Sequence, residues 1–421
     1  MFNIKKLLES IETVIERLFI EEPEIRSRLK ELACLAHDRK WEKMLAFPHP
    51  RPAIPALLAS FLSSIQNANL VREMKQIEEE CIDFTANLVG YSKNYGGFII
   101  SGGSTGNLCA LVTARDFFLG KRVDNGLLTA KKTMAITSTA AHFSIDKAIQ
   151  IIGIGKNNLV KVPVIPKNNW KPDINYLRKI LEKQPIFAVI ITFGTTETGT
   201  LEPIKEIIEL KNEHHFWVHV DAAYGGMALT IPQVRRKAEG IEKADSIVID
   251  PHKLGFIPYP SSIILFRDLE ITEKSSSLTQ QVPYFANGVS PPVIEGSRPA
   301  ASATTFWIMM KTLGEEGYAK YIKKLQNITN KFKESLETLK EVQILNEPEL
   351  PLLIFTINNR KAIIRQFLVE LNKKGYHLGY SSNIANTGIE AIRTIFSNPT
   401  IKEETIKELT EKITCLIRNL I

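Results

Sequence analysis

A lysine that follows a short apolar segment is the residue of this sequence best placed for covalent chemistry. Residues 246–249 have the length and composition of a buried strand, and Pro251 ends it because proline cannot continue a central strand. His252 and Lys253 come next, shortly before a glycine. Lys253 is either a solvated surface cation, the usual state of lysine, or an amine that forms a Schiff base when its surroundings keep part of it deprotonated.

A glycine-rich segment, SGGSTGN at 101–107, lies between an expected strand and a helix that begins near Leu108. Small residues let the backbone approach an anion closely, and the first amides of a helix carry a partial positive charge. The segment is therefore either a cradle for a phosphate group or only a tight turn.

Two more polar residues follow expected strands. His142 comes after a strand that ends near Thr137, and it is either a hydrogen-bonded structural residue or an imidazole that stacks on a flat heteroaromatic ring. Asp221 ends the apolar run 217–220 and, if buried, needs a partner such as a protonated ring nitrogen, with a helix N-cap as the alternative. Lys253 follows Asp221 by 32 residues (253 − 221), the length of one βαβ unit, so both can reach one edge of a sheet.

The elements that would position these residues alternate between strands and helices. Short apolar runs separated by helical stretches predict a mostly parallel sheet with helices on both faces. The connection from Lys253 to the last run is too short for a crossover helix, so this strand should be antiparallel to its predecessor. The seven expected strands are Gly97–Ile100, Thr133–Thr137, Leu159–Val164, Phe187–Phe193, Trp217–Val220, Ser246–Ile249 and Ser262–Phe266.

We expect three parts in the chain. Residues 1–55 form a helical segment whose apolar face packs on its own domain or on a partner subunit, and the proline-rich stretch 47–55 ends it. Residues 56–310 form a large α/β domain. Residues 311–421 form a smaller α+β domain, with strands near 352–357 and 391–396 and helices near 311–339, 362–374 and from 402 onward.

Composition argues against several classes of protein. The net charge of +7 arises from 53 basic and 46 acidic residues that are interleaved, so no basic tract marks nucleic-acid or membrane binding. No apolar run is long enough for a membrane span, and the charged N-terminus is unlike a signal peptide. The four cysteines lie far apart without metal-ligand spacing, which indicates free thiols in a reducing compartment. We expect a cytoplasmic protein without a metal site.

The phosphate cradle, the histidine, the carboxylate and the lysine occur in chain order, each after a strand. Together they suit one ligand, pyridoxal 5′-phosphate (PLP). Its aldehyde would react with Lys253, and Asp221 would keep the pyridine nitrogen protonated, so that the ring can accept the electrons of a carbanion.

At these residues the sequence resembles the group II PLP-dependent decarboxylases, which have the fold of aspartate aminotransferase. The resemblance implies PLP-dependent transferase fold type I, with a seven-stranded mostly parallel sheet in the large domain and a smaller α+β C-terminal domain. The segments that carry it are SGGSTGNLCALVTARD (101–116), AHFSIDKA (141–148), TFGTTETG (192–199), HVDAAYGG (219–226), DPHKLGFIPYPSSIILFRD (250–268) and EGSRPAASATTFW (295–307).

The resemblance also implies roles for single residues. Lys253 would bind the cofactor aldehyde, Asp221 would pair with the pyridine nitrogen, His142 would stack on the ring and His252 would assist proton transfer. These four are the expected catalytic residues, and His142, Asp221, His252 and Lys253 also contact the cofactor. The remaining expected cofactor contacts are Gly103, Ser104, Thr196, Ala223, Asp250 and Arg298.

The resemblance further implies a homodimer, with Arg298 at its interface, and a small-molecule amino-acid substrate. Pro50 and Arg51 match a segment that lines the substrate pocket in relatives. Relatives carry a catalytic tyrosine on a mobile loop after the lysine. The corresponding stretch 285–295 has no tyrosine here, and Tyr284 just before it is the remaining candidate.

The expected reaction is removal of the α-carboxylate of an L-amino acid as CO₂, most readily from an aromatic amino acid such as tyrosine. One alternative is an aspartate 1-decarboxylase, in which Arg51 would pair with the side-chain carboxylate. A second is a carbon–carbon lyase of the sphingosine-phosphate lyase type, which the Gly-Ser-Arg turn at 296–298 resembles. A binding module without activity is the third, and it would form no covalent bond at Lys253.

Overall fold

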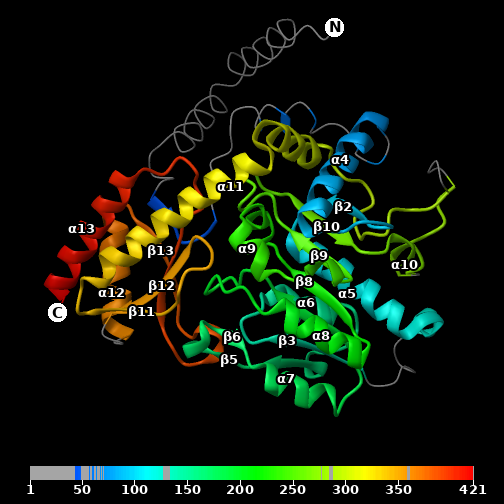
Figure 1. The fold of residues 1–421 in the computed structure, drawn as a ribbon, viewed down its shortest axis with the longest axis horizontal. Coiled ribbons are helices and arrows are strands. Elements are labelled where there is room, and N and C mark those ends of the chain that lie inside the picture. The colour runs from blue at the N-terminus through cyan, green and yellow to red at the C-terminus, as the bar shows by residue number, and fades with distance from the viewer. Residues whose placement is uncertain are drawn as a thin grey trace, which may run out of the picture.

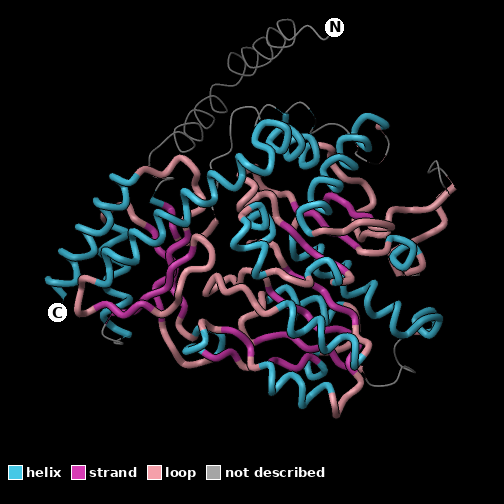
Figure 2. Tube along the Cα trace, viewed as in Figure 1, coloured by secondary structure: helices cyan, strands magenta, loops and turns pink. Residues whose placement is uncertain are grey.

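The computed structural model describes most of the chain and shows two β-sheets with helices packed around them (Figure 1). Figure 2 shows the strands gathered in two groups, with helices outside each group. The residues described are 43–48, 71–126, 133–275, 277–283, 288–357 and 361–420, with the single residues 56, 59, 60, 63, 67 and 69.

The larger sheet has seven strands in the order β2-β10-β9-β8-β7-β3-β4. All neighbours are parallel except β10, which is antiparallel to both β2 and β9. Each of the seven expected strands is present, and the antiparallel direction of the last one is confirmed. Their bounds are β2 (Gly96–Ile100), β3 (Met134–Ser138), β4 (Leu159–Val162), β7 (Ile186–Thr192), β8 (Trp217–Asp221), β9 (Ser246–Ile249) and β10 (Ser262–Phe266).

Both faces of this sheet are buried, which explains why its strands are apolar throughout instead of alternating. Along β9, Ile247 and Ile249 belong to one apolar core and Val248 to the other. The helices α5 (Gly103–Leu119) and α6 (Phe143–Ile151) supply the second core. The first core receives side chains from α4 (Arg72–Val89), α7 (Ile174–Leu181), α8 (Ile204–His214) and α11 (Ala301–Glu337).

The smaller sheet has five strands in the order β1-β13-β14-β12-β11. The helices α12 (Lys361–Lys373) and α13 (Glu403–Leu420) pack together beside it, and α11 reaches it from the larger sheet (Figure 1). Its strands are β1 (Met44–Leu45), β11 (Val342–Ile344), β12 (Leu352–Ile357), β13 (His377–Ser381) and β14 (Ala391–Ile395).

Two parts of this sheet differ from the expectation. Met44 and Leu45 lie in the segment expected to be helical, but they form a strand parallel to β13. The strands β11 and β13 were not expected, because neither contains a run of apolar residues. Residues 1–42 and 49–55 of the expected N-terminal helical segment, with Pro50 and Arg51, lie outside the described residues, and so does Tyr284.

The remaining elements are short. They include the hairpin of β5 (Val164–Ile165) and β6 (Lys171–Pro172), and the helices α9 (Pro232–Lys237) and α10 (Leu269–Glu273). Among the described helices, none combines the length and the apolar character that crossing a bilayer requires.

Candidate active site

The expected site residues gather at the carboxyl-terminal ends of the strands of the larger sheet, where open α/β sheets bind their ligands. They line a cavity of about 310 Å³, a volume at the lower end of the range for small-ligand sites. Of the thirteen expected residues, those that line this cavity are Gly103, Ser104, His142, Thr196, Asp221, Ala223, Asp250, His252 and Lys253.

Lys253 is held at the cavity by an ion pair. Its Nζ lies 2.9 Å from Asp250 Oδ2, and the Asp250 side chain is almost completely buried while that of Lys253 remains a quarter exposed. Ser262 Oγ donates a hydrogen bond to the other oxygen of Asp250. The amine is therefore oriented by a fixed carboxylate but is open toward the cavity.

His252 lies beside this pair. Its Nδ1 donates a hydrogen bond to the backbone oxygen of Ser261, and its Nε2 lies 3.6 Å from Asp250 Oδ2. Burial lowers the pKa of His252, so the ring is neutral at pH 7 and Nε2 carries a lone pair. The cavity thus contains a proton acceptor next to the lysine amine.

The glycine-rich segment forms the start of α5, which begins at Gly103, five residues before the expected start near Leu108. Gly102 is the N-cap without a side-chain cap, and no described residue accepts a hydrogen bond from the amides of Gly103 and Ser104. A Cβ atom on Gly103 would lie 2.9 Å from Asp250 Oδ2, so only glycine lets the helix start approach Asp250 this closely. Two free amides at a helix N-terminus fit a phosphate group.

Asp250 was expected to contact the cofactor, and this contact stays a prediction. Within the described residues its carboxylate interacts with Lys253, His252 and Ser262. A carboxylate offers no proton to an anion, so its position beside Gly103 makes it a neighbour of the helix start and the partner of the lysine.

Asp221 is a buried carboxylate at the end of β8, only 4% exposed. Its Oδ1 accepts the backbone amide of Ala223 and its Oδ2 accepts the side-chain amide of Asn107. These donors stabilise the anion without a positive charge, because no ion pair with a described residue is formed. A carboxylate in this state fits a protonated ring nitrogen.

His142 precedes α6 and caps it, since its Nδ1 accepts the backbone amide of Ser144. Burial lowers the pKa of His142, and the positive charge of Lys253 acts in the same direction, whereas Asp221 and Asp250 oppose it. The imidazole is therefore neutral at pH 7. A neutral, flat side chain at the cavity wall suits stacking on a heteroaromatic ring.

Thr196 lies on the turn between β7 and α8, which closes one side of the cavity. Gly194 in this turn has a φ of 106°, and a Cβ there would lie 2.9 Å from the Gly225 amide nitrogen. At the end of the turn, Glu202 accepts the Thr192 amide, and burial raises the pKa of Glu202 to about 7. The turn thus packs so closely against the strand ends that a residue larger than glycine does not fit at position 194.

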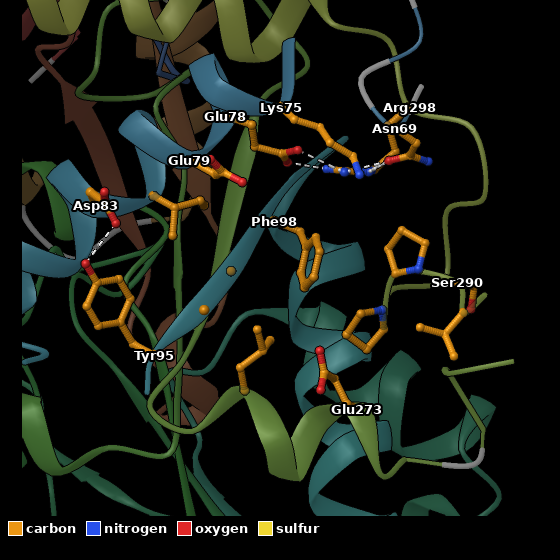
Figure 3. Close-up of a pocket in the computed structure, with 17 residues that line it drawn as sticks. Asn69, Lys75, Glu78, Glu79, Asp83, Tyr95, Phe98, Glu273, Ser290 and Arg298 are labelled. Carbon is orange, nitrogen blue, oxygen red and sulfur yellow. Dashed lines mark hydrogen bonds and ion pairs between the residues drawn. The ribbon is translucent and has the colours of Figure 1, made fainter. Parts of the chain in front are cut away.

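Arg298 is not brought to this cavity. The residue is 5% exposed, and its guanidinium donates to both oxygens of Glu78, to Asn69 and to the backbone oxygen of Ile99. Arg298, Glu78 and Asn69 border a different cavity of about 400 Å³ along the edge strand β2 (Figure 3). Arg298 does not line the cavity of Lys253, and its expected contact with the cofactor stays a prediction. An interface role stays a prediction.

The structure adds cavity residues that the sequence did not single out. Asn107 belongs to the quoted glycine-rich segment, but its place facing Asp221 depends on the register of α5 against β8. Tyr259 lines the cavity with its ring centre 4.2 Å from that of His252, and its hydroxyl donates to the backbone oxygen of Pro48. Only its short distance from Lys253 in the sequence could have suggested it.

Comparison with known proteins identifies matches over most of the chain. The family model described as "Pyridoxal-dependent decarboxylase conserved domain" matches residues 32–358. The "Probable L-tyrosine/L-aspartate decarboxylase" of Methanothermobacter thermautotrophicus is 29% identical over 82% of this chain and 89% of its own. The "L-aspartate decarboxylase" of Thermococcus kodakarensis is 29% identical over 80% of this chain and 84% of its own.

The fold is also found among solved structures. A structure described as "Crystal structure of Oryza sativa TDC with PLP" superposes with a TM-score of 0.83, covering 100% of this chain and 99% of that one, at 17% identity. At this identity the similarity establishes the shared fold.

Proposed function

Because the chain belongs to the pyridoxal-dependent decarboxylase family, we propose that it removes the α-carboxylate of L-aspartate and releases CO₂ and 3-aminopropanoate. The chain is a PLP-dependent amino-acid decarboxylase. The identity of the amino acid and the roles of single residues are the proposed parts. The observation that carries the residue roles is the ion pair of Lys253 with Asp250 in the cavity that Asp221 and His142 also line.

Each end of the cofactor has residues that fit it. Lys253 would hold the aldehyde through Nζ, the amides of Gly103 and Ser104 would bind the phosphate, and Asp221 would bind the ring nitrogen. When bound, PLP supplies an electron sink for the pair of electrons left by the departing carboxylate. The protein's part is to orient the substrate so that this bond, and no other, is the one that breaks.

Two histidines are placed to handle protons. His252 Nε2 carries a lone pair beside the Lys253–Asp250 pair and can accept a proton from the amine. His142 is neutral with its Nδ1 occupied by Ser144, so its remaining proton is on Nε2. That N–H can donate to a substrate carboxylate and hold it during the reaction.

The choice of aspartate over an aromatic amino acid is supported by the names of the relatives. Both relatives described above are named for L-aspartate, and one is named for L-tyrosine as well. The aromatic substrate expected from the sequence therefore becomes the second candidate, with tyrosine as its representative. Both relatives are named as decarboxylases, which favours CO₂ over an aldehyde as the leaving group.

The test is a screen of the twenty amino acids with purified protein and PLP, with mass spectrometry of the products. We expect 3-aminopropanoate from aspartate, accompanied by CO₂. Tyramine as the main product would show that the substrate is tyrosine and not aspartate. An aldehyde without CO₂ would refute decarboxylation. The Lys253→Ala variant is the matched control for contaminating activity.

We also propose that the active form is a homodimer. The resemblance of the N-terminal segment and of Arg298 to interface elements supports this, and the exposed apolar side chains of Phe117, Phe143 and Ile151 on the paired helices α5 and α6 offer surface for contact. Sedimentation should give twice the 47.4 kDa of one chain. An active species that sediments with the mass of one chain would contradict the proposal.

A further inference from the structure

We propose that Asn107 is a positioning residue that orients two working groups of the site through one side-chain amide: the carboxylate of Asp221 and the imidazole of His142. The inference rests on the proposed function, in which Asp221 binds the ring nitrogen and His142 stacks on the ring. It concerns how the chain holds these groups, and it applies whichever amino acid is the substrate.

The amide of Asn107 uses every hydrogen-bonding group that it has. Its side chain is 1% exposed. Both protons of Nδ2 are donated, one to Asp221 Oδ2 at 2.9 Å and one to Ser144 Oγ at 2.9 Å. Its Oδ1 lies 2.9 Å from His219 Nε2. A buried amide with all of its groups paired has one stable orientation.

His219 fixes which way this amide points. His219 is fully buried on β8, and burial lowers its pKa to about 4, so it is neutral. Because Asn107 Oδ1 can only accept, the proton of His219 must be on Nε2. Nδ1 then accepts from Ser246 Oγ, which in turn accepts the indole N–H of Trp217 at 2.9 Å. If the amide were reversed, its oxygen would face Asp221, and two acceptors would meet.

The second proton of the amide sets the state of His142. Ser144 Oγ accepts from Asn107, so its own proton is free to be donated to His142 Nδ1, 2.8 Å away. His142 Nδ1 also accepts the backbone amide of Ser144. Nδ1 therefore carries no proton, and the proton of the neutral ring is on Nε2. Among the described residues none accepts from Nε2, and the cavity that His142 lines is the space beside it.

A single side chain thus couples the two groups between which the cofactor ring would lie. With Asn107 in place, Asp221 is held as an acceptor toward the ring nitrogen and His142 is held as a donor toward the cavity. Without Asn107, Asp221 loses its side-chain donor, and Ser144 Oγ loses the donor that leaves its own proton directed to His142 Nδ1.

The test uses a matched pair of variants at His219, outside the cavity. In His219→Gln the side-chain amide can still donate to Asn107 Oδ1, whereas in His219→Leu it cannot. In the holoenzyme we expect His219→Gln to keep the pH midpoint of the cofactor's absorbance band. His219→Leu and Asn107→Leu should move the midpoint upward by about one unit, because a ring nitrogen without its held carboxylate loses the positive charge that disfavours a second proton nearby.

The same variants report on cofactor binding without any turnover. Cofactor affinity, measured by equilibrium dialysis, should fall about tenfold or more in the two leucine variants and stay within about twofold in His219→Gln. Thr113→Val is the control on the same helix, since Thr113 is buried and its hydroxyl has no partner among the described residues. It should leave the absorbance midpoint and the affinity unchanged.

The branch to His142 has its own variant, Ser144→Ala, which makes the smallest change in the network. Because His142 Nδ1 then loses the hydroxyl donor, its carbethoxylation by diethyl pyrocarbonate, followed by mass spectrometry, should be about fivefold faster. The absorbance midpoint should not move, since Asp221 keeps its partner. If a leucine variant does not fold, Ser144→Ala still tests the hydrogen-bond network.

The proposal is overturned if His219→Gln and His219→Leu behave alike, whether both shift or neither does, or if Ser144→Ala leaves the reactivity of His142 unchanged. These readouts need only bound cofactor. If the protein binds PLP but does not decarboxylate aspartate, the proposed function fails while the network remains testable. If the network fails while 3-aminopropanoate is formed, only the role of Asn107 is refuted.

Discussion

Lys253 is tied to a carboxylate that has almost no contact with solvent, and this pairing keeps the amine at one point of the cavity wall. Its remaining exposure lets a reactant reach Nζ. The first prediction follows from this geometry. After borohydride reduction in the presence of PLP, mass spectrometry should find the cofactor attached to the peptide that contains Lys253.

Lys253→Ala should abolish this attachment and lower decarboxylation at least about 10³-fold, because the covalent anchor and a proton-transfer group are lost together. Lys253→Arg keeps a positive charge beside Asp250 and serves as the control for folding, with the same loss of activity. Attachment of PLP to another lysine of the wild-type protein would contradict the assignment.

His219 gives a prediction for stability. Its folded-state pKa of about 4 lies below the ordinary value of 6.5, so below pH 6.5 the unfolded chain takes up a proton that the folded protein does not. The free energy of unfolding should therefore fall as the pH is lowered through this window. Between pH 7.5 and 5 the loss due to His219 is about 2 kcal/mol.

Urea unfolding of the wild type and of His219→Gln at both pH values measures this loss. The variant should lose less stability by this amount, since the other histidines contribute equally to both proteins. Equal losses would show that His219 is charged, or differently paired, in the folded state.

The position of Lys253, Asp221 and His142 at one cavity could be predicted from the sequence, because each follows an apolar strand, whereas their chemical roles stay predictions. The position of Asn107 could not be predicted, although it lies in the same motif as Gly103. Its function depends on which side chains of β8 and α6 face α5, and this is decided by helix packing across the sheet. Arg298 lies outside the cavity, and the sequence could not show that Glu78 and Asn69 accept hydrogen bonds from its guanidinium, because both are distant from it in the chain.

At the scale of elements, the start of α5 is the feature on which cofactor binding depends. Gly103→Ala would place a Cβ 2.9 Å from Asp250 Oδ2, which forces the carboxylate or the helix to move. We expect cofactor affinity to fall by about tenfold or more, because the free amides of the helix start and the partner of Lys253 are displaced together.

Gly102→Ala is the matched control for this variant. Gly102 has a φ of 178°, and a Cβ there would meet no atom within 4 Å. Its affinity for PLP, measured by equilibrium dialysis, should equal that of the wild type. If both alanine variants bind PLP equally well, the close approach at Gly103 is not what shapes the phosphate end of the site.

Strands of the larger sheet could be predicted, because a strand buried on both faces consists of an uninterrupted run of apolar residues. β1, β11 and β13 could not. β1 is two residues long and exists because β13, more than 300 residues later in the chain, pairs with it. β13, with the sequence HLGYS, has too few apolar residues to stand out.

At the scale of the whole molecule, the two sheets are joined at the turn that carries Thr196. Glu197 accepts the Ser381 hydroxyl and the Ala385 amide from the side of the smaller sheet. Arg393 on β14 donates to the backbone oxygen of Thr196 at 2.8 Å. In the chain, the turn follows a strand of the larger sheet, but these hydrogen bonds connect it to residues of the smaller sheet.

Glu197→Ala removes two of these bonds and leaves the buried Ala385 amide unpaired. We expect the free energy of unfolding to fall by about 2 kcal/mol, and cofactor affinity to fall with it, because Thr196 lines the cavity. Glu197→Gln keeps an acceptor and should lose less than half as much. Urea unfolding followed by tryptophan fluorescence and by cofactor absorbance gives both quantities.

If the cofactor were released well before the tryptophan signal changed in the wild type, the sheets would be independent and this interpretation would be wrong.

We propose the division near residue 311 as the boundary between the two parts. The helix α11 has a break at Gly314, with φ 58° and ψ −174°, close to this position. The sequence indicated that the pattern of strands and helices changes near this position. It did not indicate that one long helix would cross the boundary.

The pairing of Arg298 with Glu78 has a consequence for how molecules meet in solution. β2 is the outermost strand of its sheet, and the outward-facing amide and carbonyl of Ile99 are bonded to Glu78 and to Arg298. A strand from another molecule could not join there without breaking a buried ion pair. Glu78 and Arg298 therefore block the pairing of a further strand at this position of the sheet edge, and both also border the cavity beside it.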